Sequence, residues 1–135
     1  MYREVAFKFE PQRFSNKEEE IKVALQTAMS KNKIKGELRY PLPIMDLTTF
    51  KFDAAHTQGD KHPHDVTETE ARRFINEAYF AIFFKGNNSV NYFGREGAAY
   101  VQTGKKKIRT AFKAEEYNSK FKEMIEVYEN ARRES

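Results

Sequence analysis

The strongest constraint on the fold of this chain is a series of short strand-like segments in its C-terminal half. Four runs rich in aromatic and β-branched residues are separated by short segments that contain glycine or asparagine, which favour tight turns. The runs are residues 79–85, 89–93, 98–103 and 107–112. Consecutive strands joined by such short turns pair antiparallel. The sequence therefore predicts a four-stranded antiparallel meander.

Helices are predicted before and after the meander. Thr67 and Glu70 match a capping box, in which each residue bonds the other's backbone amide, so a helix should start there. Its predicted core face is Ala71, Phe74, Ile75 and Ala78, and its predicted outer face is Arg72, Arg73 and Glu77. The same motif at Ser15 and Glu18 predicts an earlier helix. A last helix is predicted over residues 114–131, with one apolar face to cover the sheet.

The remaining segments complete the predicted order. Residues 5–9 alternate apolar and polar side chains and residues 48–52 have strand composition, so both are predicted strands. Residues 37–47 connect the first predicted helix to the second predicted strand. Pro41 and Pro43 lie within this segment and exclude a regular central strand there, so it is predicted to be extended and irregular. The order β-α-β-α-β-β-β-β-α indicates an α+β fold: a mostly antiparallel sheet of four to five strands, packed by two or three helices.

The size and composition predict one domain. A chain of 135 residues can bury a core without disulfides or metal, and it has no cysteine, which excludes a disulfide framework and any cysteine-ligated zinc site. The N-terminal residues alternate apolar and charged side chains, with no continuous apolar segment of the kind found in signal peptides or membrane spans. We expect a soluble, cytosolic protein.

All three histidines, His56, His62 and His64, fall within nine residues between a predicted strand and a predicted helix. The ordinary pKa of histidine lies near neutral pH, so one imidazole can remove a proton from a nucleophile while another protonates the leaving group. In RNA the nucleophile is the neighbouring 2′-hydroxyl, and this reaction requires no metal. The segment is therefore the predicted catalytic loop.

Two other interpretations of this loop stay open. With Asp60 or Asp65, the histidines match the ligands of a zinc or other transition-metal site. Alternatively, the loop is only structural, and Pro63 holds the residue before it in an extended conformation. The concentration of all three histidines in this loop argues against the purely structural interpretation, and the acid/base interpretation is preferred to the metal site.

A second candidate site is the basic segment between Arg95 and Lys113. It has six basic residues and one acid, and so carries a net charge of +5 within a chain of net charge +4. A polyanion is expected to bind there. The predicted nucleic-acid contacts are Lys105, Lys106, Lys107, Lys113 and Tyr100, the last by stacking on a base. Lysines that keep an edge strand soluble are the alternative interpretation.

The basic segment also has a candidate catalytic residue, Arg109, which with Lys107 and Lys113 would stabilise the charge that develops on the phosphate. In a regular strand the side chains alternate between the two faces of the sheet. One face is then predicted to carry Lys107, Arg109 and Ala111, and the other Ile108, Thr110 and Phe112. The catalytic hypothesis requires Arg109 to lie near the histidine loop.

A set of short motifs in residues 49–117 carries a resemblance to a known family. The motifs are Phe52-Asp53, His56, His62-Pro63-His64, Val66-Thr67, Glu70-Ala71, Phe74-Ile75, Ala78, Tyr92, Gly97 to Val101 and Ile108 to Phe112. They resemble a phage-associated domain of the barnase, EndoU, colicin and RelE nuclease superfamily. The resemblance implies a helix followed by four strands and a toxin-like, RNA-cleaving activity.

The resemblance also implies residues and partners. The site would be formed by His56, His62 or His64 together with Arg109 and Thr110 on a later strand. Partners would be RNA and either a phage head or portal protein or a cognate immunity protein. The location would be the bacterial cytoplasm or the virion. Because members of this superfamily differ in their catalytic residues, the fold alone does not define the chemistry.

The residues and the resemblance together lead to one main functional hypothesis, a metal-independent endoribonuclease that uses the histidine loop and the basic strand and needs no cofactor. The first alternative is a non-catalytic phage structural, accessory or nucleic-acid-binding module. The second is a metal-dependent hydrolase in which His56, His62 and His64 are metal ligands.

Overall fold

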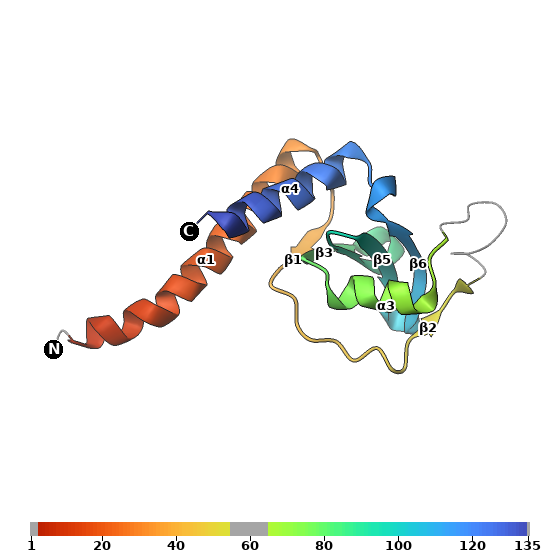
Figure 1. Ribbon diagram of the computed structural model, residues 1–135, viewed down its shortest axis with the longest axis horizontal. Coiled ribbons are helices and arrows are strands. Elements are labelled where there is room, and N and C mark those ends of the chain that lie inside the picture. Colours follow the sequence, from red (N-terminus) through yellow and green to blue (C-terminus); the bar gives the residue numbers. More distant parts are fainter. Residues whose placement is uncertain (1–2, 55–64, 135) are drawn as a thin grey trace.

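The computed structural model describes residues 3–54 and 65–134, with side chains described from residue 17 onward in those ranges. It confirms the α+β class, with helices packed on a six-stranded sheet (Figure 1). The helices are α1 (Arg3–Lys31), α3 (Glu68–Asn76) and α4 (Ser119–Arg133). The strands are β1 (Glu37–Arg39), β2 (Lys51–Phe52), β3 (Phe80–Phe84), β4 (Ser89–Phe93), β5 (Gly97–Gln102) and β6 (Lys107–Lys113). Short 3₁₀ turns follow three strands: η1 (Lys85–Asn87), η2 (Thr103–Lys105) and η3 (Ala114–Glu116).

The sheet has the strand order β1-β3-β4-β5-β6-β2. Its centre is the predicted meander, in which β3, β4, β5 and β6 pair antiparallel in sequence order. Two short strands extend it at the edges: β1 pairs antiparallel with β3, and β2 pairs parallel with β6. The sheet is therefore mixed and has six strands rather than four to five. Strands of two or three residues are too short to show a period, so the edge pairings had no clear sequence signal.

The N-terminal predictions were wrong, because α1 runs from Arg3 to Lys31 where a strand over residues 5–9 and a helix start at Ser15 were expected. In the described sheet β1 and β2 already occupy the two edges. A helix forms its backbone hydrogen bonds within itself, so residues 5–9 can satisfy their backbone groups in α1 without pairing with a strand. Glu18 does not cap a helix here; its carboxylate accepts a hydrogen bond from the Tyr40 hydroxyl at 2.6 Å. In Figure 1, the first part of α1 extends away from the sheet, and α4 lies along its last part.

Helix α3 starts at the predicted capping box. The Thr67 hydroxyl accepts from the Glu70 amide at 3.1 Å, and the Thr67 amide donates to the Glu70 carboxylate at 3.0 Å. The buried face of the helix packs on one side of the sheet and forms the α3-side core. This core comprises Leu47, Val66, Ala71, Phe74, Ile75, Ala81, Tyr92, Ala99, Val101, Ile108 and Ala111.

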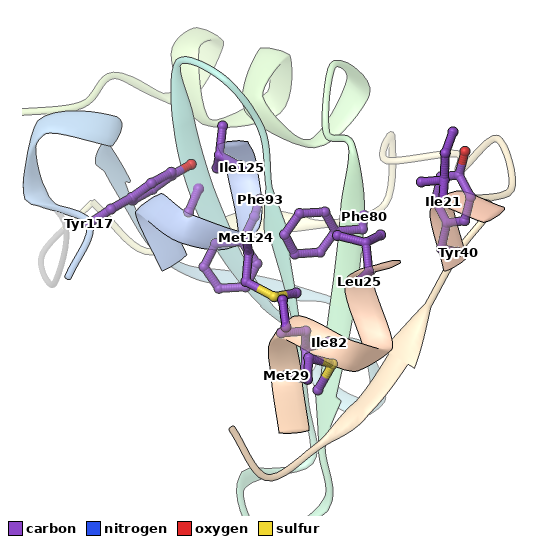
Figure 2. Packing of buried hydrophobic residues seen from close by; sticks show 12 residues of the cluster. Ile21, Leu25, Met29, Tyr40, Phe80, Ile82, Phe93, Tyr117, Met124 and Ile125 are labelled. Atoms are coloured by element: carbon purple, nitrogen blue, oxygen red, sulfur yellow. The ribbon is translucent and has the colours of Figure 1, made fainter. Parts of the chain in front are cut away.

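The opposite side of the sheet is covered by α1 and α4 and forms the α1/α4-side core. This core comprises Ile21, Leu25, Ala28, Met29, Tyr40, Phe80, Ile82, Phe93, Ala98, Tyr117, Met124 and Ile125. Figure 2 shows Leu25 of α1 and Met124 of α4 gathered around Phe80 and Phe93 of the sheet. Phe93 stacks on Phe80 and Phe121 with ring centroids 5.7 and 4.4 Å apart. Residues more than 90 positions apart in sequence therefore build this core.

The last helix begins later than predicted, at Ser119 rather than near Ala114. The turn η3 occupies residues 114–116, and the side chain of Asn118 accepts from the Phe121 amide at 3.0 Å as the helix cap. Asparagine is a strong cap because its short side chain reaches the free amides of the first turn. In the part of the chain that the structure describes, helices are too short or too polar to cross a membrane.

Candidate nucleic-acid interface

The predicted catalytic histidines, His56, His62 and His64, lie outside the described residues. Their acid/base role and the alternative metal site formed by the same side chains therefore stay predictions. The structure does describe both ends of the segment that carries them: Asp53 and Ala54 on one side, and Asp65 and the residues that lead into α3 on the other. These two ends determine where the segment is attached.

The entry end is attached to β6. The backbone amide of Asp53 donates to the carbonyl of Ile108 at 2.9 Å, which continues the parallel pairing of β2 by one residue. The Asp53 carboxylate lies 3.2 Å from the ammonium group of Lys107. Both side chains are only partly exposed, so this ion pair is better shielded than a surface pair. The chain thus enters the histidine segment beside the basic strand.

The exit end is held by α3. Val66, directly before the helix cap, is fully buried in the α3-side core. The Arg72 guanidinium donates to the carbonyls of Leu47 and Phe50 at 2.7 and 2.8 Å and pairs with Glu68 at 2.6 Å. Arg72 was predicted to point outward; instead it joins the first turns of α3 to the segment that leads into β2. Both ends of the histidine segment are therefore held at the β2–β6 edge.

Strand β6 departs from the regular alternation of side chains that its sequence predicts. Between the pairs Tyr100–Thr110 and Val101–Ile108 the register shifts by one residue, and Arg109 lies at this irregularity with an exposed side chain. The shift places Ile108 and Ala111 in the same core, although they were predicted on opposite faces. A β-bulge of this kind inserts one unpaired residue and redirects a side chain. Ile108 is fully buried, whereas the adjacent Arg109 is exposed. Arg109 is therefore an exposed cation next to the entry end of the histidine segment.

Thr110, which the resemblance placed in the site, is buried with 8% exposure. Its hydroxyl oxygen has no hydrogen-bond partner among the described residues. It lies in a row of polar side chains that crosses the sheet, since Thr110 pairs with Tyr100 and Tyr100 pairs with Asn91. A buried hydroxyl without a partner costs about 1–3 kcal/mol, so this position is not optimised for stability alone.

Tyr100 is the central member of this row. Its ring contacts Phe93 and Phe112 edge to face, with centroids 6.0 and 5.3 Å apart, and it is partly buried against the α1/α4-side core. Burial raises the pKa of Tyr100 to about 12. The hydroxyl therefore keeps its proton at neutral pH and can donate a hydrogen bond to an anion. Phe93 itself is fully buried in this core.

The predicted basic segment separates into two groups in space. Lys105 and Lys106 are exposed in the turn between β5 and β6, next to Lys107. Lys113 lies at the other end of β6, about 20 Å away for six residues of extended strand. There its charge helps to lower the pKa of Glu70, after the larger effect of the Thr67 amide. Lys113 therefore does not join the other predicted nucleic-acid contacts.

Sequence reasoning missed several polar residues near this region. Ser89 and Asn91 are buried on β4 and bond to each other at 2.5 Å, on the same sheet face as Tyr100. Their alternation with Val90 and Tyr92 is visible in the sequence, and polar residues at every second strand position could have indicated a polar sheet face. Asp53 was named only as part of the Phe52-Asp53 motif, and its pairing with Lys107 depends on tertiary contacts.

The described residues contain no group of three or more histidine, cysteine, aspartate or glutamate side chains that could hold a metal ion. The chain matches none of the protein-family models, curated proteins or solved structures with which it was compared. The resemblance to phage-associated nuclease domains therefore stays an expectation based on the motifs.

Proposed function

We propose that this protein is an endoribonuclease that acts without a metal ion, with its site at the β2–β6 edge. The observation that supports the proposal is the attachment of the histidine segment. Its entry is held by the Asp53–Lys107 pair and its exit by Val66 and the Thr67 cap, so both attachment points of the segment that carries the three histidines are fixed. Acid/base cleavage of RNA would require the histidines to lie near Arg109, and the entry of their segment beside the basic strand supports such an arrangement.

The proposed reaction is an internal transfer at phosphorus. One histidine removes the proton of a ribose 2′-hydroxyl, and the 2′ oxygen forms a bond to the adjacent phosphorus. The bond from phosphorus to the 5′ oxygen breaks, and a second histidine donates its proton to that oxygen. The products are a 2′,3′-cyclic phosphate and a new 5′-hydroxyl end. His56, His62 and His64 are the candidates for the two roles.

The residues of β5 and β6 provide the proposed binding groups for the phosphate. Arg109 is exposed at the irregular position of β6, so its guanidinium is free to approach the negative charge that develops on the phosphate oxygens. Tyr100 is protonated at neutral pH and can donate to a phosphate or ribose oxygen. Both groups act by hydrogen bonding and charge and need no metal.

The test is cleavage of total RNA by purified protein, with and without EDTA. We expect cleavage that persists in EDTA, and end-group analysis that detects the cyclic phosphate. His64→Ala should lower the rate by about 10²–10⁴-fold, as for loss of a general acid or base, and Arg109→Ala by about 10²–10³-fold, as for loss of an electrostatic stabiliser. The matched control is Arg95→Ala, which removes an exposed arginine from the turn between β4 and β5. Undiminished cleavage by both site variants contradicts the proposal.

A second candidate function is a non-catalytic nucleic-acid-binding module. It is favoured by the exposed lysines Lys105 and Lys106, which bind a polyanion without any need for the histidines. Binding that weakens steeply with salt, with no product formed under any condition, would support this candidate. Cleavage that is lost in EDTA would instead indicate the metal-dependent alternative at the histidine loop.

A further inference from the structure

One end of the sheet gathers lysines from four separate parts of the chain. At this end β1, β2, β4 and β6 begin, and β3 and β5 finish. The lysine end, as we call it, comprises Lys33 and Lys35 before β1, Lys51 at the start of β2, Lys85 in η1, and Lys105 and Lys106 in and after η2. All six are exposed. Only Lys105 and Lys106 belong to the basic segment that is visible in the sequence.

The lysine end is continuous from one edge of the sheet to the other. Lys33 and Lys35 line a groove of about 860 Å³ between the end of α1 and β1. Lys35 and Lys85 share the adjoining hollow of about 470 Å³. The next two turns are neighbours, because a Cβ built on Gly104 would lie 3.2 Å from the side-chain nitrogen of Asn88.

At the far edge the backbone amide of Lys51 donates to the carbonyl of Lys106 at 2.9 Å. Six strands at a spacing of about 4.8 Å make this end of the sheet about 24 Å wide. Such a width accommodates several successive phosphates of an extended single strand.

The charges of these six lysines are not neutralised within the described part of the protein, where none of them takes part in an ion pair. Glu37, the acid that lines both hollows, pairs with Arg39 at 3.0 Å. Other lysines do have partners, such as Lys31 with Glu123 at 3.0 Å. Unpaired like charges on one surface repel one another, and a polyanion would relieve that repulsion.

The backbone provides a second, independent observation. The turns after β3 and β5 have the same form, a 3₁₀ turn that ends in a left-handed residue, Asn88 at φ 50° and Lys106 at φ 49°. Asparagine suits this conformation, whereas lysine does not. Lys33 is left-handed too, at φ 55°. Two lysines therefore occupy positions where asparagine or glycine would fold better, which indicates that the charge itself is used.

We propose that the lysine end is the path of a single-stranded RNA, which crosses the sheet from the α1–β1 groove to the β2–β6 edge. At that edge Lys51 and Lys106 deliver the strand to the site of the proposed endoribonuclease. The inference rests on RNA as the target in that proposed function and is independent of cleavage. Lys33 and Lys35, the lysines most distant from Arg109, become binding residues that act through the phosphate backbone.

The experiment measures binding of the full chain to a 2′-O-methyl RNA 12-mer, which has no free 2′-hydroxyl and so cannot be cleaved. Fluorescence anisotropy over a series of salt concentrations gives the affinity and its salt slope. Lys33→Gln with Lys35→Gln should weaken binding about tenfold and lower the salt slope by about 1.4, which is two phosphate contacts on a single strand. The matched control is Lys120→Gln with Lys122→Gln, two exposed lysines on α4.

A separate variant distinguishes charge from folding. Lys106→Asn places asparagine at the left-handed position of the turn after β5, as Asn88 already does in the turn after β3. The protein should therefore melt at the same or a higher temperature, while its affinity for the 12-mer falls. If the Lys33/Lys35 pair binds as tightly as the α4 control pair, or if Lys106→Asn leaves the affinity unchanged, the proposed path is wrong. Weaker binding of both variants supports it even if the protein cleaves no RNA.

Discussion

The two sides of the sheet are covered by different helices and differ in the side chains that they bury. The α3-side core is lined by apolar side chains and is set by a helix whose start is encoded in four consecutive residues, 67–70. The α1/α4-side core is assembled from helices at opposite ends of the chain. Among the described residues the buried polar side chains are Ser89, Asn91 and Thr110, and the strand alternation places all three on the α1/α4 side. The difference indicates that one side of the sheet serves stability, while the other also contains buried polar side chains, among them Thr110 next to Arg109.

The largest expected effect is on the α1/α4 side. Phe93→Ala removes a fully buried ring that contacts Phe80, Tyr117 and Phe121, and should lower the free energy of unfolding by about 3–5 kcal/mol. Urea denaturation measures the loss. If both cores form one cooperative unit, the midpoint falls while the slope is unchanged. A separate second transition would show instead that the two sides fold independently.

A smaller effect is expected on the α3 side, where the test adds one methyl group at a closely packed contact instead of removing a large side chain. A Cβ on Gly97 would overlap the ring of Phe74, which is itself 3% exposed and cannot move away easily. Gly97→Ala should therefore destabilise the protein by about 1–3 kcal/mol in the same urea assay. Gly86→Ala is the control, because a Cβ on Gly86 meets no atom within 4 Å. Equal stability of the two variants would mean that the α3–β5 contact is looser than the structure shows.

The next effect concerns the row of polar side chains formed by Asn91, Tyr100 and Thr110, and it changes the free energy of unfolding in the opposite direction. Thr110→Val replaces the unpartnered hydroxyl by a methyl group of similar volume, so the free energy of unfolding should stay the same or rise by about 1 kcal/mol. RNA cleavage by this variant should fall if the hydroxyl serves the site. Thermal melting and the RNA assay are the two measurements. A clear loss of stability would indicate that the hydroxyl has a partner and belongs to the core.

The smallest expected effect concerns the α3 cap and depends on pH. The Thr67 amide lowers the pKa of Glu70, so ionised Glu70 stabilises the folded protein above its unfolded pKa, and this contribution is lost as the pH falls through the folded pKa. Glu70→Gln should therefore be less stable than the parent protein at pH 7, by a few tenths of a kcal/mol for so exposed a group. The difference should disappear in acid, and melting curves over pH 2.5–7 measure it. A difference that persists unchanged at low pH would exclude the charge as its cause.

The local structure of this protein could be predicted where neighbouring residues satisfy one another. The Thr67 cap and the strands β3 to β6 depend on bonds within a turn or on the alternation of side chains, and both are visible in the sequence. The histidine loop was recognised as a candidate site from composition alone, and its chemistry stays a prediction. Lys105, Lys106 and Arg109 were predicted as site residues because they lie close together in a basic segment of the sequence, and their roles stay predictions.

Only the tertiary structure decided the long-range pairings. The parallel pairing of β2 with β6 joins residues more than 50 positions apart, and the register shift in β6 breaks an alternation that the sequence displays as regular. The lysine end is built from four chain segments, so no local window contains it. Local hydrogen bonds can form from neighbouring residues alone, whereas strand pairing and charge clusters depend on which distant segments the folded sheet brings together.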